Sequence, residues 1–222
     1  MAARLIVIEG SDGAGKETQA KLLLDYLVGQ GKKVATVSFP RYKQTLGGWM
    51  LWEVLKSERA SQYGFSKVAP RVASKLYTMD REESLPYLQD LLQNNEIVIS
   101  DRYVESNLLH QGGKFADDDE KVAFAEWLYS VEYGDIKLPV PDEIVYLALP
   151  FWLSRKRAEA RASNDGPKLD AVESDIEYVK QGHKAGLFYA EHFSWKVIEG
   201  MAFQTELTRE EIHERIVVRL GY

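Results

Sequence analysis

The sequence predicts an α/β fold, in which a parallel five-stranded sheet carries helices on both faces. Short, nearly continuous apolar segments, typical of buried parallel strands, alternate with longer segments of helical spacing. A glycine-rich stretch joins the first apolar segment to the first helical one. The 222 residues contain no internal repeat and no convincing linker, so we expect one domain over residues 1–222.

The expected strands are RLIVIE (residues 4–9), KVATVSF (33–39), EIVISD (96–101), EIVYLALP (143–150) and WKVIE (195–199). Pro40 ends the second segment abruptly, because proline cannot donate a hydrogen bond within a sheet. Asp101 ends the third, and therefore puts a carboxylate at the carboxyl end of a buried strand. Open α/β sheets bind their ligands at that end of the strands.

The expected helices cover residues 15–30, 46–56, 66–83, 85–94, 118–133, a segment starting at 151, 171–192 and 208–220. The first shows Leu23 and Leu27 on its apolar face, and the last opens with the capping box TREE. Between two of them lies ARASNDGPKLD, a polar segment containing Gly and Pro. We expect this segment to form a mobile lid over about residues 155–170.

The composition excludes several classes of protein. A net charge of −6 argues against broad affinity for nucleic acid. The chain has no cysteine, which excludes disulfides, thiolate metal sites and cysteine nucleophiles and fits a cytoplasmic location. No secretory signal is visible and no apolar stretch is long enough to span a bilayer. We therefore expect neither a nucleic-acid partner nor a membrane partner.

The stretch GSDGAGKETQ, Gly10 to Gln19, lies between the first predicted strand and the first predicted helix. This is where a phosphate-binding P-loop belongs, because its backbone N–H groups and the helix N-terminus attract phosphate oxygens. Lys16 is placed to reach the outer phosphates; the alternative is a plain glycine turn with a solvated lysine. The residues expected to bind ATP are Gly10, Ser11, Gly13, Ala14, Gly15, Lys16, Glu17 and Thr18.

Three further motifs accompany the P-loop: FPRY after the second strand, LYTMDRE on a helix, and DRYVESNLLHQGG after the third strand. Together with IEGSDGAGK, this pattern resembles the thymidylate kinase family, P-loop enzymes that transfer phosphate from ATP to dTMP. The resemblance runs in order from Ile6 to about Asp175. It implies a P-loop NTPase-type sheet, Mg²⁺ as cofactor, ATP as co-substrate and a homodimer.

The same resemblance implies the residues that bind dTMP: Asp12, Arg41, Tyr77, Arg81, Arg102, Asn107 and Gln111. Arg41 corresponds to the arginine that holds the acceptor phosphate, a task suited to a bidentate guanidinium. Tyr77 and Arg81 are four residues apart on one helix and therefore face the same way. By chemistry alone, a core tyrosine beside an external arginine is the alternative explanation of that pair.

Catalysis is assigned by the resemblance to Asp12, Lys16, Arg102, Arg157 and Arg161. The P-loop has Gly13 and Ala14 where some members carry an arginine, so the lid must supply the positive charge. Arg157 and Arg161 are expected to act together, with Arg155 and Lys168 as further cations in the same segment. Each of them is also explained by a basic, solvated helix end.

Two positions depart from the family pattern. Glu17 replaces the Ser or Thr whose hydroxyl usually holds magnesium, and His110 replaces a Tyr or Phe beside the sugar. We expect Asp101 and Glu17 to hold Mg²⁺, with a solvent-facing Glu17 as the alternative. Two other functions stay open: a kinase for another nucleoside monophosphate or a deoxynucleoside, and an inactive nucleotide-binding protein.

Overall fold

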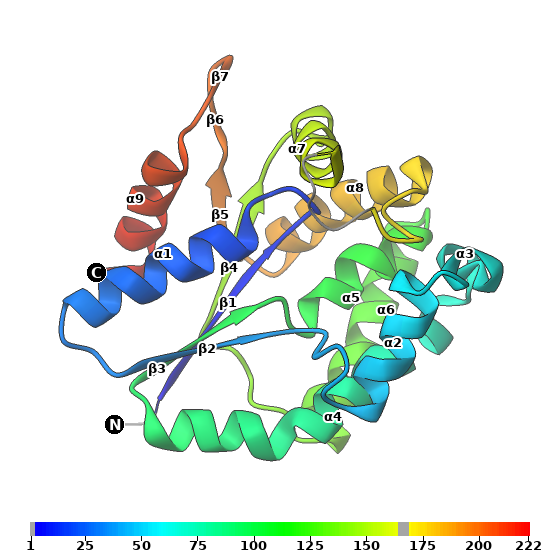
Figure 1. Cartoon of the computed structure of the whole chain (residues 1–222), viewed down its shortest axis with the longest axis horizontal. Coiled ribbons are helices and arrows are strands. Elements are labelled where there is room, and N and C mark those ends of the chain that lie inside the picture. Colours follow the sequence, from blue (N-terminus) through cyan, green and yellow to red (C-terminus); the bar gives the residue numbers. More distant parts are fainter. Residues whose placement is uncertain (1–2, 164–168) are drawn as a thin grey trace.

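The computed structural model describes residues 3–163 and 169–222, and its centre is a five-stranded parallel sheet (Figure 1). The strands are β1 (Arg4–Gly10), β2 (Val34–Ser38), β3 (Ile97–Asp101), β4 (Glu143–Ala148) and β5 (Lys196–Glu199). Their order across the sheet is β2-β3-β1-β4-β5, and every neighbouring pair is parallel. The predicted α/β fold with five parallel strands is therefore confirmed.

The helices are α1 (Lys16–Gly29), α2 (Leu46–Lys56), α3 (Ala60–Tyr63), α4 (Pro70–Asn94), α5 (Glu105–His110), α6 (Asp118–Tyr129), α7 (Phe151–Ser163), α8 (Ile176–His192) and α9 (Arg209–Leu220). Figure 1 shows α1 and α9 on one side of the sheet and α4, α5, α6 and α8 on the other. Among the described residues, none of these helices is long and apolar enough to cross a membrane.

The side chains of β1 explain why helices cover both faces. Leu5 and Val7 belong to the core cluster that includes residues of α5, α6 and α8, whereas Ile6 and Ile8 belong to the cluster beneath α1 and α9. Successive residues of a strand point to opposite faces, so a continuous apolar run needs an apolar layer on each side. These four side chains are at most 1% exposed.

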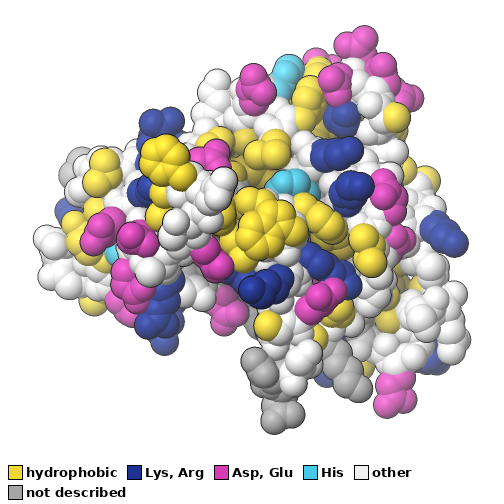
Figure 2. Space-filling model, turned by 90° about the horizontal axis from the view of Figure 1, so that it is seen from above, with side chains coloured by type: hydrophobic (Ala, Val, Ile, Leu, Met, Phe, Trp, Pro, Cys, Tyr) yellow, Lys and Arg dark blue, Asp and Glu magenta, His cyan; other side chains and the backbone are white. Residues whose placement is uncertain are grey.

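The sheet register brings three loops together at one edge. Ile8 of β1 and Ser38 of β2 both pair with Asp101 of β3, and Gly10 pairs with Leu147 of β4. The chain therefore leaves β1, β2 and β3 side by side, at the carboxyl ends of the strands. Figure 2 views the molecule from that side and shows Lys and Arg side chains around a hydrophobic centre.

One predicted break in the helices was wrong. The two helices expected over 66–83 and 85–94 form the single helix α4, which continues through Pro86. Proline removes one helical hydrogen bond and costs about 3 kcal/mol in a helix interior. Here Leu88 is buried, and Leu85 and Leu91 pack against the same core, so apolar packing on both sides of Pro86 offsets that cost.

Other boundaries also differ from the prediction. The helix expected over 118–133 is α-helical only to Tyr129 and continues as a π-helical turn, Ser130–Asp135. The helix expected from 171 begins at Ile176, capped by the Asp175 side chain. A short hairpin of β6 (Met201–Ala202) and β7 (Thr205–Glu206) was missed, whereas the capping box at Thr208 is present as predicted. The π-helical turn supplies a residue that contacts the site, and the hairpin supplies a partner for a residue of α7.

Candidate active site

The P-loop leaves β1 and opens α1, where two glycines are required for different reasons. Gly15 has a φ of 90° and occupies the N-cap of α1, a left-handed conformation that other residues rarely adopt. Gly13 has a φ of 85°, and a Cβ there would lie 2.1 Å from the carbonyl oxygen of Ser154 in α7. The loop is therefore packed against the first turn of α7, which any side chain at position 13 would push away.

Lys16 folds back over the P-loop. Its Nζ donates to the carbonyl oxygens of Gly10 (2.9 Å) and Ser11 (3.0 Å) and lies 3.9 Å from Oδ1 of Asp12. The residue is 7% exposed, so the alternative of a solvated lysine is wrong. Burial and the neighbouring Arg102 guanidinium lower the pKa of this ammonium, while Asp12 and Asp101 raise it. The ammonium group of Lys16 therefore binds two backbone carbonyl oxygens and lies close to the carboxylates of Asp12 and Asp101.

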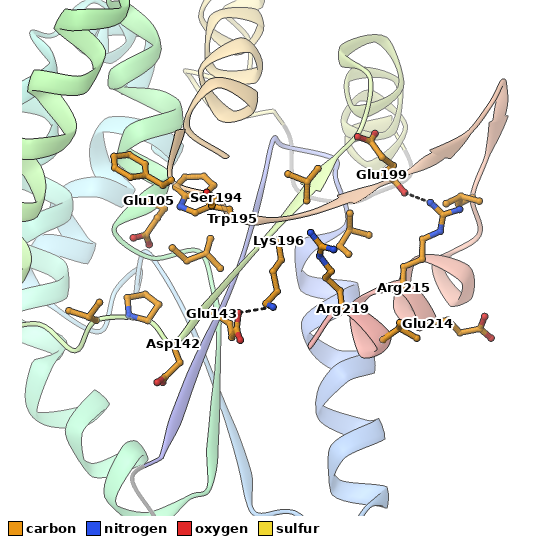
Figure 3. A pocket seen from close by; sticks show the side chains of 18 of the residues that line it. Glu105, Asp142, Glu143, Ser194, Trp195, Lys196, Glu199, Glu214, Arg215 and Arg219 are labelled. Atoms are coloured by element: carbon orange, nitrogen blue, oxygen red, sulfur yellow. Dashed lines mark hydrogen bonds and ion pairs between the residues drawn. The ribbon is translucent and has the colours of Figure 1, made fainter. Parts of the chain in front are cut away.

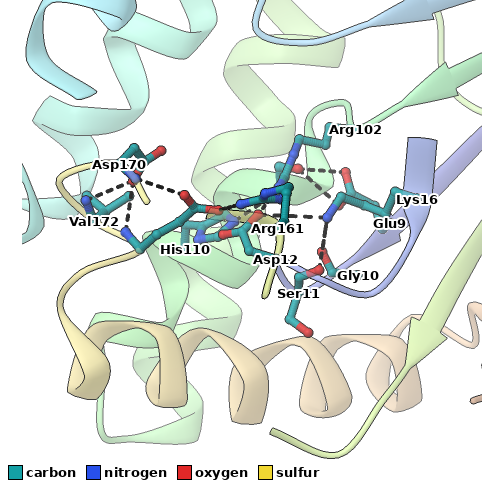
Figure 4. A network of polar contacts seen from close by, with 12 residues as sticks. Glu9, Gly10, Ser11, Asp12, Lys16, Arg102, His110, Arg161, Asp170 and Val172 are labelled. Carbon is teal, nitrogen blue, oxygen red and sulfur yellow. Dashed lines mark hydrogen bonds and ion pairs between the residues drawn. The ribbon is translucent and has the colours of Figure 1, made fainter. Parts of the chain in front are cut away.

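Asp12 and Arg102 form a hydrogen-bonded ion pair beside Lys16 (Figure 4). Burial would raise the pKa of Asp12, but Arg102 and Lys16 outweigh it and hold that pKa well below its usual range. For Arg102, burial acts to lower the pKa, but the carboxylates of Asp12, Glu9 and Asp101 together outweigh it and raise that pKa. Both groups are therefore charged at neutral pH. The pair links the P-loop to the loop after β3.

His110 meets the other side of Arg102, with its Nε2 3.3 Å from Nη1 of the guanidinium. Burial lowers the pKa of this imidazole to about 4, so the ring is neutral at physiological pH. Nε2 then accepts from Arg102, which leaves the proton on Nδ1. Because the ring also stacks on Tyr178 of α8, at 6.0 Å between centroids, His110 steadies Arg102 from α5.

The buried Glu9 of β1 fixes the loop that carries Arg102. Its carboxylate accepts from the Tyr103 amide (2.9 Å) and from the Ser106 hydroxyl (2.8 and 2.9 Å). Arg102 itself has a φ of 66°, a strained value for a residue with a side chain. Sequence reasoning missed this role, although a carboxylate inside an otherwise apolar strand is a signal that could have revealed it.

Asp12, Arg102 and His110 form one end of a cavity of about 290 Å³, and Lys16 lies next to Asp12 without lining the cavity itself. Its lining includes Asp12, Glu17, Pro40, Tyr42, Tyr77, Arg81, Arg102, Asn107, His110, Arg161 and Asp170. Tyr77 and Arg81 both line it, as their four-residue spacing on α4 predicts. Burial raises the pKa of Tyr77, so its hydroxyl is un-ionised at neutral pH. The cavity thus joins an aromatic and amide-lined region to the charged end.

Arg81 is held by a residue that sequence reasoning missed, Glu132 of the π-helical turn. The guanidinium donates from Nε to Oε2 (3.0 Å) and from Nη2 to Oε1 (2.5 Å), and Thr78 donates to the same carboxylate (2.7 Å). Arg81 is 2% exposed and Glu132 0%. The remaining Nη1 lies 3.3 Å from the Tyr103 carbonyl oxygen, so the arginine also braces the loop after β3.

Several predicted site residues are not among those that line the cavity. Arg41 donates to Ser84 (3.3 Å) and Gln44 (2.9 Å) and lies over the Tyr87 ring. Gln111 is fully buried and donates to the hydroxyl of Tyr178 (3.0 Å). Arg41, in the segment after β2, therefore contacts α4, and Gln111, at the end of α5, contacts α8.

The lid arginines make ion pairs with acidic residues. Arg157 of α7 pairs with Glu206 of the β6–β7 hairpin at 2.5 Å, away from the cavity. Arg161 pairs with Glu173 at 2.6 Å, and both of these residues line the cavity. Arg155 binds the Glu173 carbonyl oxygen (2.5 Å) and the Glu159 carboxylate (2.6 Å). Lys168 lies outside the described residues.

The predicted metal ligands differ in exposure. Oδ1 of Asp101 is buried and has no hydrogen-bond partner among the described residues, which fits an atom that awaits a cation. Asp101 also lies close enough to Lys16 to raise its pKa. Glu17 and Thr18 are exposed at the start of α1, and Glu17 lines the cavity. In the part of the chain that is described, no group of three acidic or histidine side chains surrounds a single point.

Comparison with known proteins supplies independent findings. The family model for thymidylate kinase matches residues 8–212. The thymidylate kinase of Mycobacterium tuberculosis is 34% identical over 188 residues, which cover 84% of each chain. A probable thymidylate kinase of Thermococcus onnurineus is 29% identical over 96% of this chain and 94% of its own. The thymidylate kinase of Schizosaccharomyces pombe is 26% identical over 96% and 90%.

Proposed function

The chain belongs to the thymidylate kinase family, and from that premise we propose how its cavity performs the reaction. The protein is an enzyme that transfers the γ-phosphoryl group of ATP to dTMP, giving ADP and dTDP. The alternatives, a kinase for another acceptor and an inactive nucleotide-binding protein, are not favoured by this membership. One observation carries the assignment of the site: Lys16 and the Asp12–Arg102 pair meet at one end of a cavity lined by Tyr77 and Asn107.

The donor phosphates bind in the P-loop. The backbone N–H groups from Gly10 to Thr18 surround the β-phosphate, and Lys16 exchanges its two carbonyl acceptors for phosphate oxygens. Arg102 lies between the P-loop and the acceptor side, where its guanidinium can bind both phosphates. The attacking group is an already ionised phosphate oxygen of dTMP, so no general base is needed. Catalysis is then positioning and charge neutralisation.

The thymidine part of dTMP binds at the other end of the cavity. Tyr77 stacks on the base, and Arg81 and Asn107 face its polar edge. The amide Nδ2 of Asn107 is buried and has no partner among the described residues, which fits a donor waiting for a base carbonyl. Gln111 approaches the same edge from behind Tyr178, and Arg41 turns from Gln44 to the acceptor phosphate.

Mg²⁺ supplies charge neutralisation on the transferring phosphates when it is bound. Asp101 is the residue best suited to hold it, because its buried Oδ1 has no partner among the described residues. Glu17 offers a second carboxylate from the exposed first turn of α1. The fold contributes by placing Asp101 at the end of β3. Glu9 holds the next segment in position by accepting a hydrogen bond from the Tyr103 amide.

The lid completes the site by exchanging partners. Arg157 and Arg161 leave Glu206 and Glu173 and move onto the transferring phosphoryl group, whose negative charge exceeds that of a single carboxylate. Both ion pairs are partly exposed, so breaking them costs little. The same movement excludes water from the cavity. The lid spans about residues 155–170 of a single kinase domain.

Two copies of the chain form a homodimer through α2. Its Leu46, Trp49 and Met50 are 63%, 49% and 41% exposed, a concentration of large apolar side chains that supports a protein contact. Substituting Trp49 by Asp should give a monomer in sedimentation equilibrium, whereas an unchanged mass would remove α2 from the interface. The cytoplasm is the location we propose, since the chain has no cysteine and uses ATP.

The deciding experiment follows ADP release by the purified protein with ATP and a panel of acceptors. With dTMP we expect turnover at least about 100-fold above that with dCMP, dAMP or dGMP, because mismatched bases leave buried polar groups unpaired. Thymidine, an acceptor without a phosphate, is included in the same panel to test whether the acceptor phosphate is required. Turnover of thymidine but not of dTMP would contradict the assignment, and so would ATP binding without ADP release for every acceptor.

A further inference from the structure

A second, larger hollow lies at the opposite side of α5, along the exposed edge of β5 (Figure 3). Its volume is about 1430 Å³. The lining comes from the end of α6, the segment before β4, β5 with its preceding residues, and α9. The nucleotide cavity is lined by Ser106, Asn107 and His110 of α5, whereas this groove is lined by Glu105 of the same helix. None of the residues assigned to nucleotide binding or phosphoryl transfer lines this groove.

Glu105 is the unusual feature of the groove. It is 1% exposed, and its Oε1 accepts from the Tyr133 hydroxyl at 2.7 Å. Its Oε2 is buried and has no hydrogen-bond partner among the described residues. Arg81, a cation near enough to influence it, is already paired with Glu132. A buried carboxylate oxygen without a partner costs free energy, and therefore calls for an explanation.

The walls beside Glu105 are aromatic. Tyr129 lies 5.2 Å from Tyr133 and 5.4 Å from Phe193, measured between ring centroids, and Phe193 lies 6.4 Å from Trp195. All four rings line the groove. Aromatic faces next to a carboxylate form the environment that attracts an organic cation and covers an alkyl chain.

Charge is distributed unevenly along the groove. Figure 3 shows Glu105 and Asp142 on one side and Arg215 and Arg219 on the other. Lys196, between them, is paired with Glu143 at 3.3 Å. Asp142 is exposed, and its Oδ2 accepts from the Leu5 amide at 2.7 Å. The end near Glu105 therefore carries two carboxylates, and the lining residues described at that end include no lysine or arginine.

We propose that this end of the groove binds a linear aliphatic diamine, with one ammonium group donating to Oε2 of Glu105 and the other facing Asp142. The methylene chain then lies against the four aromatic rings. A divalent metal ion fits less well, because hard cations need several oxygen ligands and these walls are mostly apolar.

Isothermal titration with 1,4-diaminobutane, on the protein without nucleotides, tests the proposal independently of kinase activity. We expect saturable binding, and none by 1,4-butanediol, a neutral molecule of the same length. Glu105→Gln keeps the acceptor for Tyr133 and should weaken binding at least about 10-fold. Glu214→Gln, which neutralises an acidic residue lining the α9 side, is the matched control and should change affinity less than about 2-fold. Equal losses in both variants would mean diffuse attraction to acidic surface and would overturn the site.

The pH dependence of wild-type binding gives a second test that needs no variant. Burial raises the pKa of Glu105 to about 7, with Glu9 of β1 raising it further and Tyr133 and Arg81 lowering it; Tyr129 and Tyr103 are further titratable groups near this carboxyl. A diamine stays protonated over this range, so affinity should rise about 10-fold from pH 6 to pH 8 as Glu105 ionises. In Glu105→Gln the rise should be absent. Affinity that is flat with pH in the wild type, or no binding at all, would overturn the proposal.

Discussion

The floor of the nucleotide cavity and its lid both present arginines, but they hold them differently. On the floor, Arg81 is 2% exposed and makes a bidentate contact with the fully buried Glu132. On the lid, the side chains of Arg157 and Arg161 are 29% and 41% exposed, and they pair with Glu206 of the hairpin and Glu173 of a turn. In the mechanism proposed above, the floor is arranged before substrate binds, whereas the lid arginines exchange their partners.

The energetics of ion pairs explain this difference. Removing one partner of a buried pair typically costs 3–5 kcal/mol, because the remaining charge is left without compensation. An exposed pair contributes about 0–1 kcal/mol and is readily exchanged for a stronger anion such as a phosphate. Stability and catalysis should therefore separate between the two regions.

Lys16→Ala should produce the largest effect. Lys16 is the only positively charged residue of the P-loop, Gly10 to Thr18, and its loss should abolish measurable ADP release. Stability should fall by no more than about 2 kcal/mol, because relief of a buried charge offsets the two lost hydrogen bonds. Near-wild-type turnover in this variant would remove the P-loop from the mechanism.

Glu132→Gln should be the largest change in stability. It leaves the Arg81 guanidinium buried without a full negative charge, so we expect the free energy of unfolding to drop by about 3–5 kcal/mol in urea titrations. The KM for dTMP should rise as well, because Arg81 then loses its fixed orientation. Glu206→Gln is the matched control on the lid, where the drop should stay below about 1 kcal/mol. Similar losses in both variants would erase the distinction between floor and lid.

Replacing both Arg157 and Arg161 by Ala should have the opposite effect, a large loss of activity with little loss of stability. We expect kcat to fall about 100-fold, with only a modest change in the KM for dTMP, because these charges act mainly in the transition state. The unfolding midpoint should move little, since both ion pairs are partly exposed. A raised KM with an unchanged kcat would assign the two arginines to ground-state binding.

Much of this floor could be predicted from the sequence, because patterns among residues close together in the chain identify it. The P-loop, Asp101 and Arg102 follow directly from strands that apolar runs identify, and Tyr77 and Arg81 share a helix face by spacing alone. Glu132 was hidden because it reaches Arg81 across 51 residues and from a π-helical turn, which no short motif indicates. Pro86 was misjudged for a related reason: tertiary packing on both of its sides outweighs the local preference for a break.

The lid was the least predictable part. Its basic residues were evident, but Arg157 and Arg161 take their partners from the hairpin at Glu206 and the turn at Glu173, elements whose position depends on the assembled fold. Arg41 shows the same limit. Its place after β2 is correct, yet its guanidinium direction is set by Gln44, Ser84 and Tyr87.

Tyr77→Ala should have a smaller effect, limited to the binding of dTMP at the floor of the cavity. A lost base–aromatic stack is worth about 1–3 kcal/mol, so the KM for dTMP should rise roughly 5- to 150-fold while that for ATP stays nearly constant. Tyr77→Phe keeps the ring and should remain close to the wild type, because the un-ionised hydroxyl contributes little to stacking. An unchanged dTMP KM in the alanine variant would mean that Tyr77 supports the core next to Phe65 instead.

Glu17→Ala should have the smallest effect on activity. Glu17 lies in the first turn of α1 and lines the cavity. Glu17 is exposed in the first turn of α1, where a negative charge contributes about 0.3–1 kcal/mol through the helix dipole. It also lines the cavity near Asp12, so a triphosphate would be repelled unless a cation stood between them. We therefore expect the variant to need several-fold more Mg²⁺ for half-maximal activity, at saturating ATP and dTMP, with the dTMP KM unchanged. Glu17→Gln separates the two explanations, because it keeps the size and loses the charge: it should shift the Mg²⁺ curve as far as alanine does. If both curves superimpose on that of the wild type, Glu17 acts only on the stability of α1, and Asp101 alone carries the metal.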